Sequence, residues 1–275
     1  MEKLIAHLIL LDSHWVPPAK DRGAALYIRP CLMATQGSLN LKSPLKAKLI
    51  VILTPLPFMK FDQFKLYCDP KHVRAYPGGT GHLKLASNYA PATKVTSDAQ
   101  MSGYNQILWV YGDCQYITEI GAMNFFVFWK NSVDKYNELV TPPVGELSLG
   151  TERMDNLVLP GITRDSVIKL AKENRIVVSE RFIKLVELKE AHQNGRIKEV
   201  FGTGTALGIV RITKIAVYNP SNANPIDIMN FSYETVDDAN SPSFIIRNAL
   251  TQIQNGEMDD DFGWTTDCQT LLSSY

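Results

Sequence analysis

The sequence has few cysteines and no long apolar run. Its 275 residues include four cysteines, and no two of them form a C-x-x-C pair (Cys31, Cys68, Cys114 and Cys268). Such scattered cysteines exclude a disulfide-rich scaffold and a zinc ribbon, and they suit a reducing compartment. The longest apolar runs, such as residues 49–53, have the length of a strand and are too short to cross a bilayer.

An excess of charge of one sign is also missing. Lys plus Arg and Asp plus Glu are both 28, so the net charge is zero, which argues against a nucleic-acid-binding protein with a strong electrostatic footprint. The hydrophobic content of 45% and the charged content of 20% predict a folded chain with a real core. The length suits one large domain or two modest ones.

Short strands and helices follow one another without strict β-α-β alternation, which predicts the α+β class. The expected strands are 25–30, 47–53, 106–110, 116–129 with turns, 139–143, 176–181 and 199–207, and the expected helices are 4–11, 82–103, 163–173, 186–194 and 243–255. The continuous apolar run at 47–53 predicts a buried strand. Trp109 and the aromatic run 125–129 are expected in the core.

Three turns marked by glycine offer backbone N–H groups with little steric cover, which is what an anion site needs. They are Gly-Gly-Thr-Gly at 78–81, Leu-Pro-Gly-Ile-Thr-Arg at 159–164 and Phe-Gly-Thr-Gly-Thr-Ala at 201–206. The second turn also opens a predicted helix, where free N–H groups and the helix dipole favour phosphate. Taken singly, each turn is more often an ordinary turn or cap.

Two charged residues stand among apolar or small neighbours. Lys84 either extends to solvent, which is the usual case, or is partly desolvated, which lowers its pKa and makes the amine nucleophilic. Glu119 is either an exposed strand residue or a carboxylate that meets a buried cation. His82 is expected at a solvent-facing helix start.

Together these segments resemble a known family. Residues 78–89 resemble the catalytic-lysine segment of the branched-chain amino acid aminotransferases, the fold-type IV enzymes that use pyridoxal 5′-phosphate (PLP). Four further stretches match in the family's order: 26–30, 106–112 with 117–119, 159–164 and 201–206. The similarity extends from about Leu4 to Trp264, and five motifs in order are highly specific.

The resemblance implies a truncated small α/β domain and a larger pseudo-barrel domain. The remainder of the small domain would be residues 1–59, the interdomain linker 60–64 and the large PLP-binding domain 65–275. Lys84 would be the catalytic residue, bonding to PLP and moving a proton between the substrate and the cofactor. The PLP-binding residues would be Lys84, Tyr89 at the phenolic oxygen, Glu119 at the ring nitrogen, and Ile162, Thr163 and Thr205 at the phosphate.

The resemblance also implies a substrate site and a homodimer. The substrate-binding residues would be Tyr27, Arg29, Gln106, Thr205 and Ala206. Tyr27 and Arg29 would reach the neighbouring subunit's pocket, and Arg29 is the candidate cation for the second carboxylate of glutamate. Leu39, Leu41 and Phe58 would lie near the substrate side chain. The expected partners are amino acids and 2-oxo acids, without a metal, a nucleic acid or a membrane.

The implied reaction transfers the amino group of L-leucine, L-isoleucine or L-valine to 2-oxoglutarate. One alternative is a truncated, weakly active or inactive paralogue, because family members carry a further segment before the position of Leu4. Another is a related aminotransferase acting on an unusual amino acid, because Ala122 stands where the family usually has threonine. Residues 144–158 are expected to form a longer loop than the family's connection. A cytoplasmic and a mitochondrial location both remain open.

Overall fold

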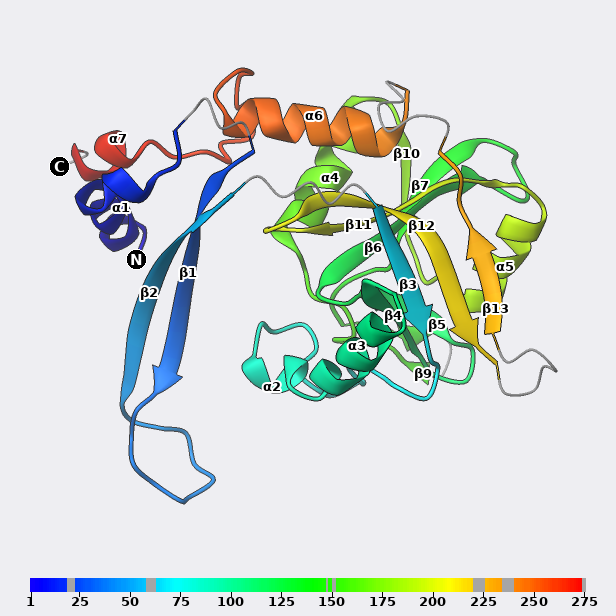
Figure 1. Ribbon diagram of the computed structural model, residues 1–275, viewed down its shortest axis with the longest axis horizontal. Coiled ribbons are helices and arrows are strands. Elements are labelled where there is room, and N and C mark those ends of the chain that lie inside the picture. The colour runs from blue at the N-terminus through cyan, green and yellow to red at the C-terminus, as the bar shows by residue number, and fades with distance from the viewer. Residues whose placement is uncertain are drawn as a thin grey trace. The chain divides into compact units, whose positions relative to one another are not determined.

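The computed structural model describes residues 1–18, 23–57, 63–146, 148–149, 152–219, 226–233 and 240–273 (Figure 1). The chain forms two compact units, one of Met1–Lys60 with Thr251–Tyr275 and one of Phe61–Leu250. The C-terminal residues, which we assigned to the large domain, thus group with the N-terminal residues. Residues 63 and 64 of the expected linker belong to a strand. The domain division itself stays a prediction.

The first unit contains a long two-stranded ribbon and two short helices. Its elements are α1 (Glu2–Leu11), the 3-10 turn η1 (Ser13–Trp15), β1 (Ala25–Ala34), β2 (Ala47–Leu56) and α7 (Cys268–Ser273). β1 and β2 pair antiparallel along their whole length, and α1 contacts α7 (Figure 1). The helix expected at 4–11 is confirmed.

The burial predicted for residues 47–53 is wrong. The strand forms within β2, but Leu49, Ile50 and Ile52 are exposed. Among the described residues β1 and β2 make a two-stranded sheet of their own, and such a ribbon has no second layer of apolar side chains to pack against. The ribbon therefore presents an apolar surface.

The second unit is built on a sheet that closes on itself. Its elements are β3 (Gln63–Cys68), α2 (Ala86–Tyr89), α3 (Ala92–Met101), β4 (Gln106–Tyr111), β5 (Tyr116–Ile120), β6 (Met123–Lys130), β7 (Asn137–Thr141), β8 (Ser148–Leu149), β9 (Glu152–Arg153), α4 (Ile162–Glu173), β10 (Val177–Glu180), α5 (Leu185–Gln193), β11 (Ile197–Gly204), β12 (Gly208–Tyr218), β13 (Ile226–Asn230) and most of α6 (Pro242–Gln254). The strand order is β10-β7-β6-β11-β12-β3-β4-β5, and β13 pairs with β12. β5 also pairs with β6, so six strands form a ring (Figure 1). The predicted α+β class and barrel-like domain are confirmed.

Buried apolar side chains lie on both faces of these strands. Successive strand residues point to opposite faces, and Phe125, Val127 and Val210 belong to the buried cluster on one face. The predicted core aromatics Trp109, Phe125, Phe126 and Trp129 are at most 1% exposed. The face opposite to Phe125 carries Trp109 and Phe126 together with the polar residues Glu119 and Asn124.

The helix predicted over residues 82–103 is wrong in its first part. The chain forms the short α2 and then α3, with Pro91 as the N-cap of α3. Proline has no N–H to donate and its ring clashes with the preceding helical turn, so one helix does not continue through this position. Lys84 lies in the irregular segment just before α2 rather than in a helix.

The long loop expected at 144–158 is anchored to the core. It contains the short antiparallel pair β8–β9. Met154, Leu157 and Val158 are buried in a cluster with Tyr116.

No helix in the described part of the chain combines the length and the apolar content needed to cross a membrane.

A buried ion pair joins β11, β12 and the start of α6. Arg211 Nε lies 2.8 Å from Glu199 Oε1, and both side chains are 3% exposed. The Ser243 backbone N–H donates to Glu199 Oε2 at 3.1 Å. We expect Glu199→Ala to lower the free energy of unfolding by about 3–5 kcal/mol, because the Arg211 charge stays buried without this carboxylate.

Urea denaturation measures the effect of Glu199→Ala. Lys94→Ala is the matched control, because the Lys94–Asp98 pair is 82% and 51% exposed. Its loss should cost less than about 0.5 kcal/mol. Equal effects of the two substitutions would contradict a structural role for the buried pair.

Candidate active site

Glu119 on β5 is the buried charge at the centre of the candidate site. It is 1% exposed. Its Oε1 accepts a hydrogen bond from the Leu159 backbone N–H at 2.6 Å, and its Oε2 lies 2.9 Å from Arg74 Nε. Burial raises the pKa of Glu119 to about 7, against the opposing effects of Arg74, the Leu159 N–H and Lys84. Glu119 is therefore not an exposed strand residue but the carboxylate that meets a buried cation, the second of the two predicted alternatives.

Arg74 is the cation, and the sequence reasoning missed it. Its Nη1 donates to the carbonyl oxygens of Gly81 at 3.0 Å and Leu157 at 3.3 Å. Its guanidinium carbon lies 5.7 Å from the centre of the Tyr89 ring. Arg74 thus ties the glycine turn before Lys84 to Glu119. No local pattern marks Arg74, because its partner Glu119 is 45 residues away in the sequence.

Lys84, the predicted catalytic residue, is exposed. Its Nζ is 5.4 Å from the centre of the Tyr89 ring. The solvent-reaching interpretation of Lys84 is therefore the one observed. Asn88 shapes the turn, because its Nδ2 donates to the carbonyl oxygens of Thr80 at 2.7 Å and Leu83 at 2.8 Å.

Two side chains near the lysine hold polar atoms with no partner. Tyr89 Oη is buried and makes no hydrogen bond within the described residues. The same is true of His82 Nδ1. His82 is half-buried and lies in a turn, so the prediction of a solvent-facing helix start was wrong. The first helix of this segment, α2, begins only at Ala86.

The N-terminus of α4 offers backbone N–H groups. Gly161 is the N-cap and makes no side-chain capping bond. The first N–H groups of a helix have no partner inside it, and here they belong to Ile162, which is 79% exposed, and to Thr163. Free N–H groups and the helix dipole favour an anion at this end.

A row of polar side chains crosses three neighbouring strands. Glu119 on β5 pairs with Asn124 on β6, and Asn124 pairs with Thr203 on β11. Directly opposed residues share a face of the sheet, and this face is opposite to that of Phe125. Thr203 Oγ1 is buried and has no partner in the described part of the chain.

The second and third glycine turns meet this row. Leu159 contacts Glu119 and Asn124 through its backbone. Thr205 and Ala206 follow Thr203 in the exposed turn between β11 and β12. The structure therefore brings Glu119 close to the turn before α4. It places Thr205 and Ala206 just after the end of β11, the strand that neighbours β6.

Comparison with known proteins gives the family. The model of class IV aminotransferases matches residues 1–215. The chain belongs to the class IV aminotransferase family. It is 40% identical over 229 residues to the branched-chain-amino-acid aminotransferase of Dictyostelium discoideum, covering 82% of this chain and 57% of that protein. The chain thus spans somewhat more than half the length of this relative.

Solved structures agree with the family. The branched-chain amino acid aminotransferase from Escherichia coli has a TM-score of 0.63 and 25% identity, covering 89% of this chain and 69% of that one. An aminotransferase from Brucella abortus, bound to the cofactor PLP, has a TM-score of 0.57 and 20% identity, covering 85% and 69%. The first of these supports the family, and the second supports the fold alone.

Other residues expected in the site of this class IV aminotransferase are placed as follows. Gln106 on β4 lies against Gly121, where an added Cβ would stand 2.2 Å from Gln106 Oε1. Tyr27 and Arg29 lie on β1 in the other unit, where Arg29 Nη2 donates to Tyr27 Oη at 3.3 Å. Their roles stay predictions.

Three further residues are expected near the substrate side chain, and the structure describes two of them, Leu39 and Leu41. Leu39 and Leu41 lie between β1 and β2 and are fully exposed. Phe58 is outside the described residues. No three His, Cys, Asp or Glu side chains of the described chain gather as metal ligands.

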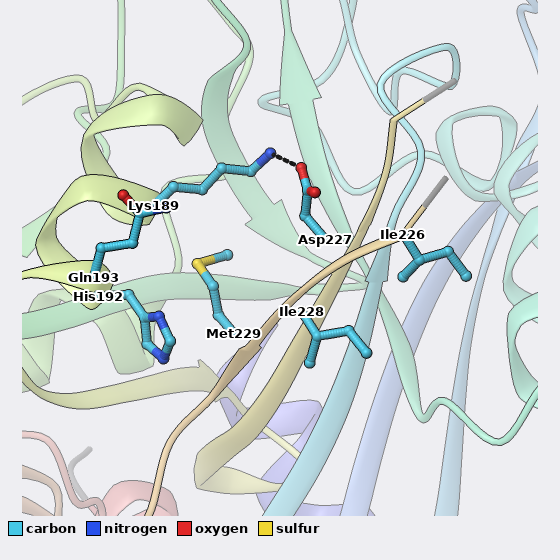
Figure 2. Close-up of a pocket in the computed structure, with 7 residues that line it drawn as sticks. All are labelled: Lys189, His192, Gln193, Ile226, Asp227, Ile228 and Met229. Atoms are coloured by element: carbon cyan, nitrogen blue, oxygen red, sulfur yellow. Dashed lines mark hydrogen bonds and ion pairs between the residues drawn. The ribbon is translucent and has the colours of Figure 1, made fainter. Parts of the chain in front are cut away.

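A groove lies between α5 and β13 of this class IV aminotransferase, and its lining residues differ from those of the candidate active site. It is lined by Lys189, His192, Gln193, Ile226, Asp227, Ile228 and Met229 (Figure 2). Lys189 Nζ and Asp227 Oδ2 form an ion pair at 2.8 Å beside it. The groove shares no residue with the candidate active site.

Proposed function

We propose that this chain transfers the amino group of L-leucine, L-isoleucine or L-valine to 2-oxoglutarate with PLP as cofactor. The observation that carries the proposal is the buried Glu119 carboxylate. It is paired with Arg74 and bonded to Leu159, three residues before the start of α4. A buried ionisable pair beside an anion-binding helix end is expected at a functional site. The family and its branched-chain relatives support the substrate class.

The residues present fit PLP. A protonated ring nitrogen needs a carboxylate, and Glu119 supplies one. A phenolic oxygen needs a donor, and Tyr89 Oη is buried with no partner among the described residues. A phosphate needs several N–H or O–H donors, and the uncapped start of α4 at Ile162 and Thr163 provides them, with Thr205 as the hydroxyl.

Glu119 and Arg74 would set the charge at the ring end of the cofactor. PLP, when bound, supplies a ring that withdraws electrons from the substrate Cα. Glu119 must be ionised to hold a proton on the ring nitrogen by a charge-assisted bond. Arg74 and the Leu159 N–H oppose the effect of burial on the pKa of Glu119. The carboxylate is thereby available near neutral pH.

Lys84 and the β11–β12 turn would act on the substrate. The Lys84 amine would take the proton from the substrate Cα and return one in the second half-reaction, so one base serves both halves. Thr205 and Ala206 would receive the α-carboxylate. Arg29 would bind the second carboxylate of glutamate, which leucine lacks. One amino group leaves the first substrate and the same group enters 2-oxoglutarate.

We further propose that two copies of the chain associate. Leu32 on β1 is 75% exposed, and Leu49, Ile50 and Ile52 on β2 are also exposed. Exposed apolar surface of this kind is typical of a protein interface. Association through the ribbon would allow Tyr27 and Arg29 of one copy to approach the other copy's site. Sedimentation equilibrium would then give twice the chain mass.

A coupled assay tests the proposed function. The chain is incubated with PLP, L-leucine and 2-oxoglutarate, and glutamate is measured over time. We expect glutamate to form with leucine, isoleucine and valine, and not with D-leucine. Formation of glutamate only from another amino acid would support the related-aminotransferase alternative, to which Ala122 in place of the family's usual threonine points. Binding of PLP without turnover would support the weakly active paralogue.

A further inference from the structure

Asn124 on β6 lies between the two ends of the proposed cofactor site. We propose that Asn124 is a positioning residue, whose amide fixes the Leu159–Gly161 turn so that the N-terminus of α4 and the Glu119 carboxylate keep a set spacing. This inference rests on the proposed function. The fixed spacing is thereby assigned to the Asn124 side chain, whose hydrogen bond goes to the turn before α4 and not to α4 itself.

Leu159 links the two ends of the site through its backbone. Its N–H donates to Glu119 Oε1 at 2.6 Å. Its carbonyl oxygen accepts a hydrogen bond from Asn124 Nδ2 at 2.9 Å. Both polar atoms of this one residue are thus held by neighbouring side chains of the polar row. A movement of the turn would have to break one of these bonds.

Close packing of Gly161 on Asn124 adds a second constraint. A Cβ on Gly161 would stand 2.1 Å from Asn124 Oδ1, a distance that no Cβ can accept. Gly161 has an extended backbone with φ −69° and ψ 134°, which any residue can adopt. Glycine is therefore required here for its lack of a side chain, so that the turn can approach Asn124.

The residue between them stiffens the connection. Pro160 joins Leu159 to Gly161, and proline fixes its own φ near −65°. A displacement of Leu159 would therefore also displace the start of α4. Asn124 itself is 5% exposed, so solvent does not compete strongly for its amide.

The helix body is held separately. Arg164 Nη2 donates to the Pro142 carbonyl oxygen at 2.8 Å and lies 2.7 Å from Glu180 Oε2. Removing the Asn124 amide should therefore loosen the turn without detaching α4. The expected defect is in the geometry of phosphate binding rather than in the fold.

The experiment compares two ligands that differ only in the phosphate. Dissociation constants for PLP and for pyridoxal are measured on the full chain for the wild type and for Asn124→Ala. We expect the ratio of pyridoxal to PLP dissociation constants to fall about tenfold in the variant, the effect of losing about 1.4 kcal/mol from the phosphate end. Binding of pyridoxal, which uses the ring end, should change by less than about threefold.

Asn131→Ala is the matched control. Asn131 directly follows β6 at its other end, is half-buried, and donates from Nδ2 to Glu138 Oε1 at 2.9 Å. It should leave the ratio unchanged. Should Asn124→Ala not fold, Asn124→Ser, a smaller and still polar substitution that does not reach the Leu159 carbonyl, should lower the ratio in the same way.

Each outcome separates the inference from the proposed function. Equal weakening of both ligands would show that Asn124 only supports the fold, and an unchanged ratio would show that it does not position the turn. Either result overturns the inference while the proposed function stands. Failure of the wild type to bind PLP at all would overturn the proposed function and this inference with it.

Discussion

Replacing Lys84 with alanine should abolish transamination. We expect a fall in kcat of at least about 10³-fold, because in the proposed function Lys84 is both the group that bonds to the cofactor and the base that moves the proton. Lys84 is exposed and contacts the Tyr89 ring, so its loss should leave the fold intact. Glutamate formation from leucine measures the rate, and the thermal unfolding midpoint measures stability.

Two further variants make the Lys84 result specific. Lys84→Arg keeps the positive charge but removes the nucleophilic amine, so it should be as inactive as Lys84→Ala. Lys94→Ala removes an equally exposed lysine on α3, paired only at the surface with Asp98, and should keep full activity. A Lys84→Ala variant that retains turnover would contradict the assignment of this lysine.

Replacing Arg74 with glutamine should shift the activity of the chain to higher pH. The pKa of Glu119 is already raised to about 7 by burial, and Arg74 is the strongest opposing influence. An adjacent opposite charge lowers a carboxyl pKa by about 1–3 units, so its removal should raise the pKa of Glu119 further. Less Glu119 would then be ionised at pH 7, and activity there should fall at least about tenfold.

The direction in which the activity of Arg74→Gln changes with pH distinguishes an electrostatic role of Arg74 from a purely structural one. Glu119 is expected to act as a carboxylate, so the lost activity of Arg74→Gln should partly return as the pH rises toward 9. Arg74→Lys keeps a cation and should shift the acidic limb of the kcat/KM profile less. Glu119→Gln does not titrate and should lose that limb altogether. A loss of activity that is equal at every pH would mean that Arg74 acts only by holding the Gly81 and Leu157 carbonyls.

Local sequence patterns determine much of this fold. The aromatic run 125–129 is expected in the core, and Phe125, Phe126 and Trp129 are buried there; the helix expected at 163–173 forms as α4. Failures arise where tertiary context decides. The strand expected at 25–30 continues beyond Pro30, which pairs with Val51 within β1, because a two-stranded ribbon leaves one edge of each strand without a ladder partner.

The candidate site was predictable only in part. Lys84, Glu119 and the turn before α4 were found because motifs in the sequence mark them. Arg74 and Asn124 were not, because their roles depend on partners far along the chain, 45 residues away for Arg74 with Glu119 and 35 for Asn124 with Leu159. Such pairs form through strand register and loop closure, which no local pattern encodes.

The proposed function requires that this class IV aminotransferase chain binds PLP at Lys84 and transaminates. The most direct test is a visible absorbance spectrum of the purified chain after incubation with PLP, repeated after addition of L-leucine. We expect a band from lysine-bound cofactor that is lost or shifted when leucine is added, and that does not form in Lys84→Ala. A spectrum identical to that of free PLP, unchanged by leucine, would contradict it.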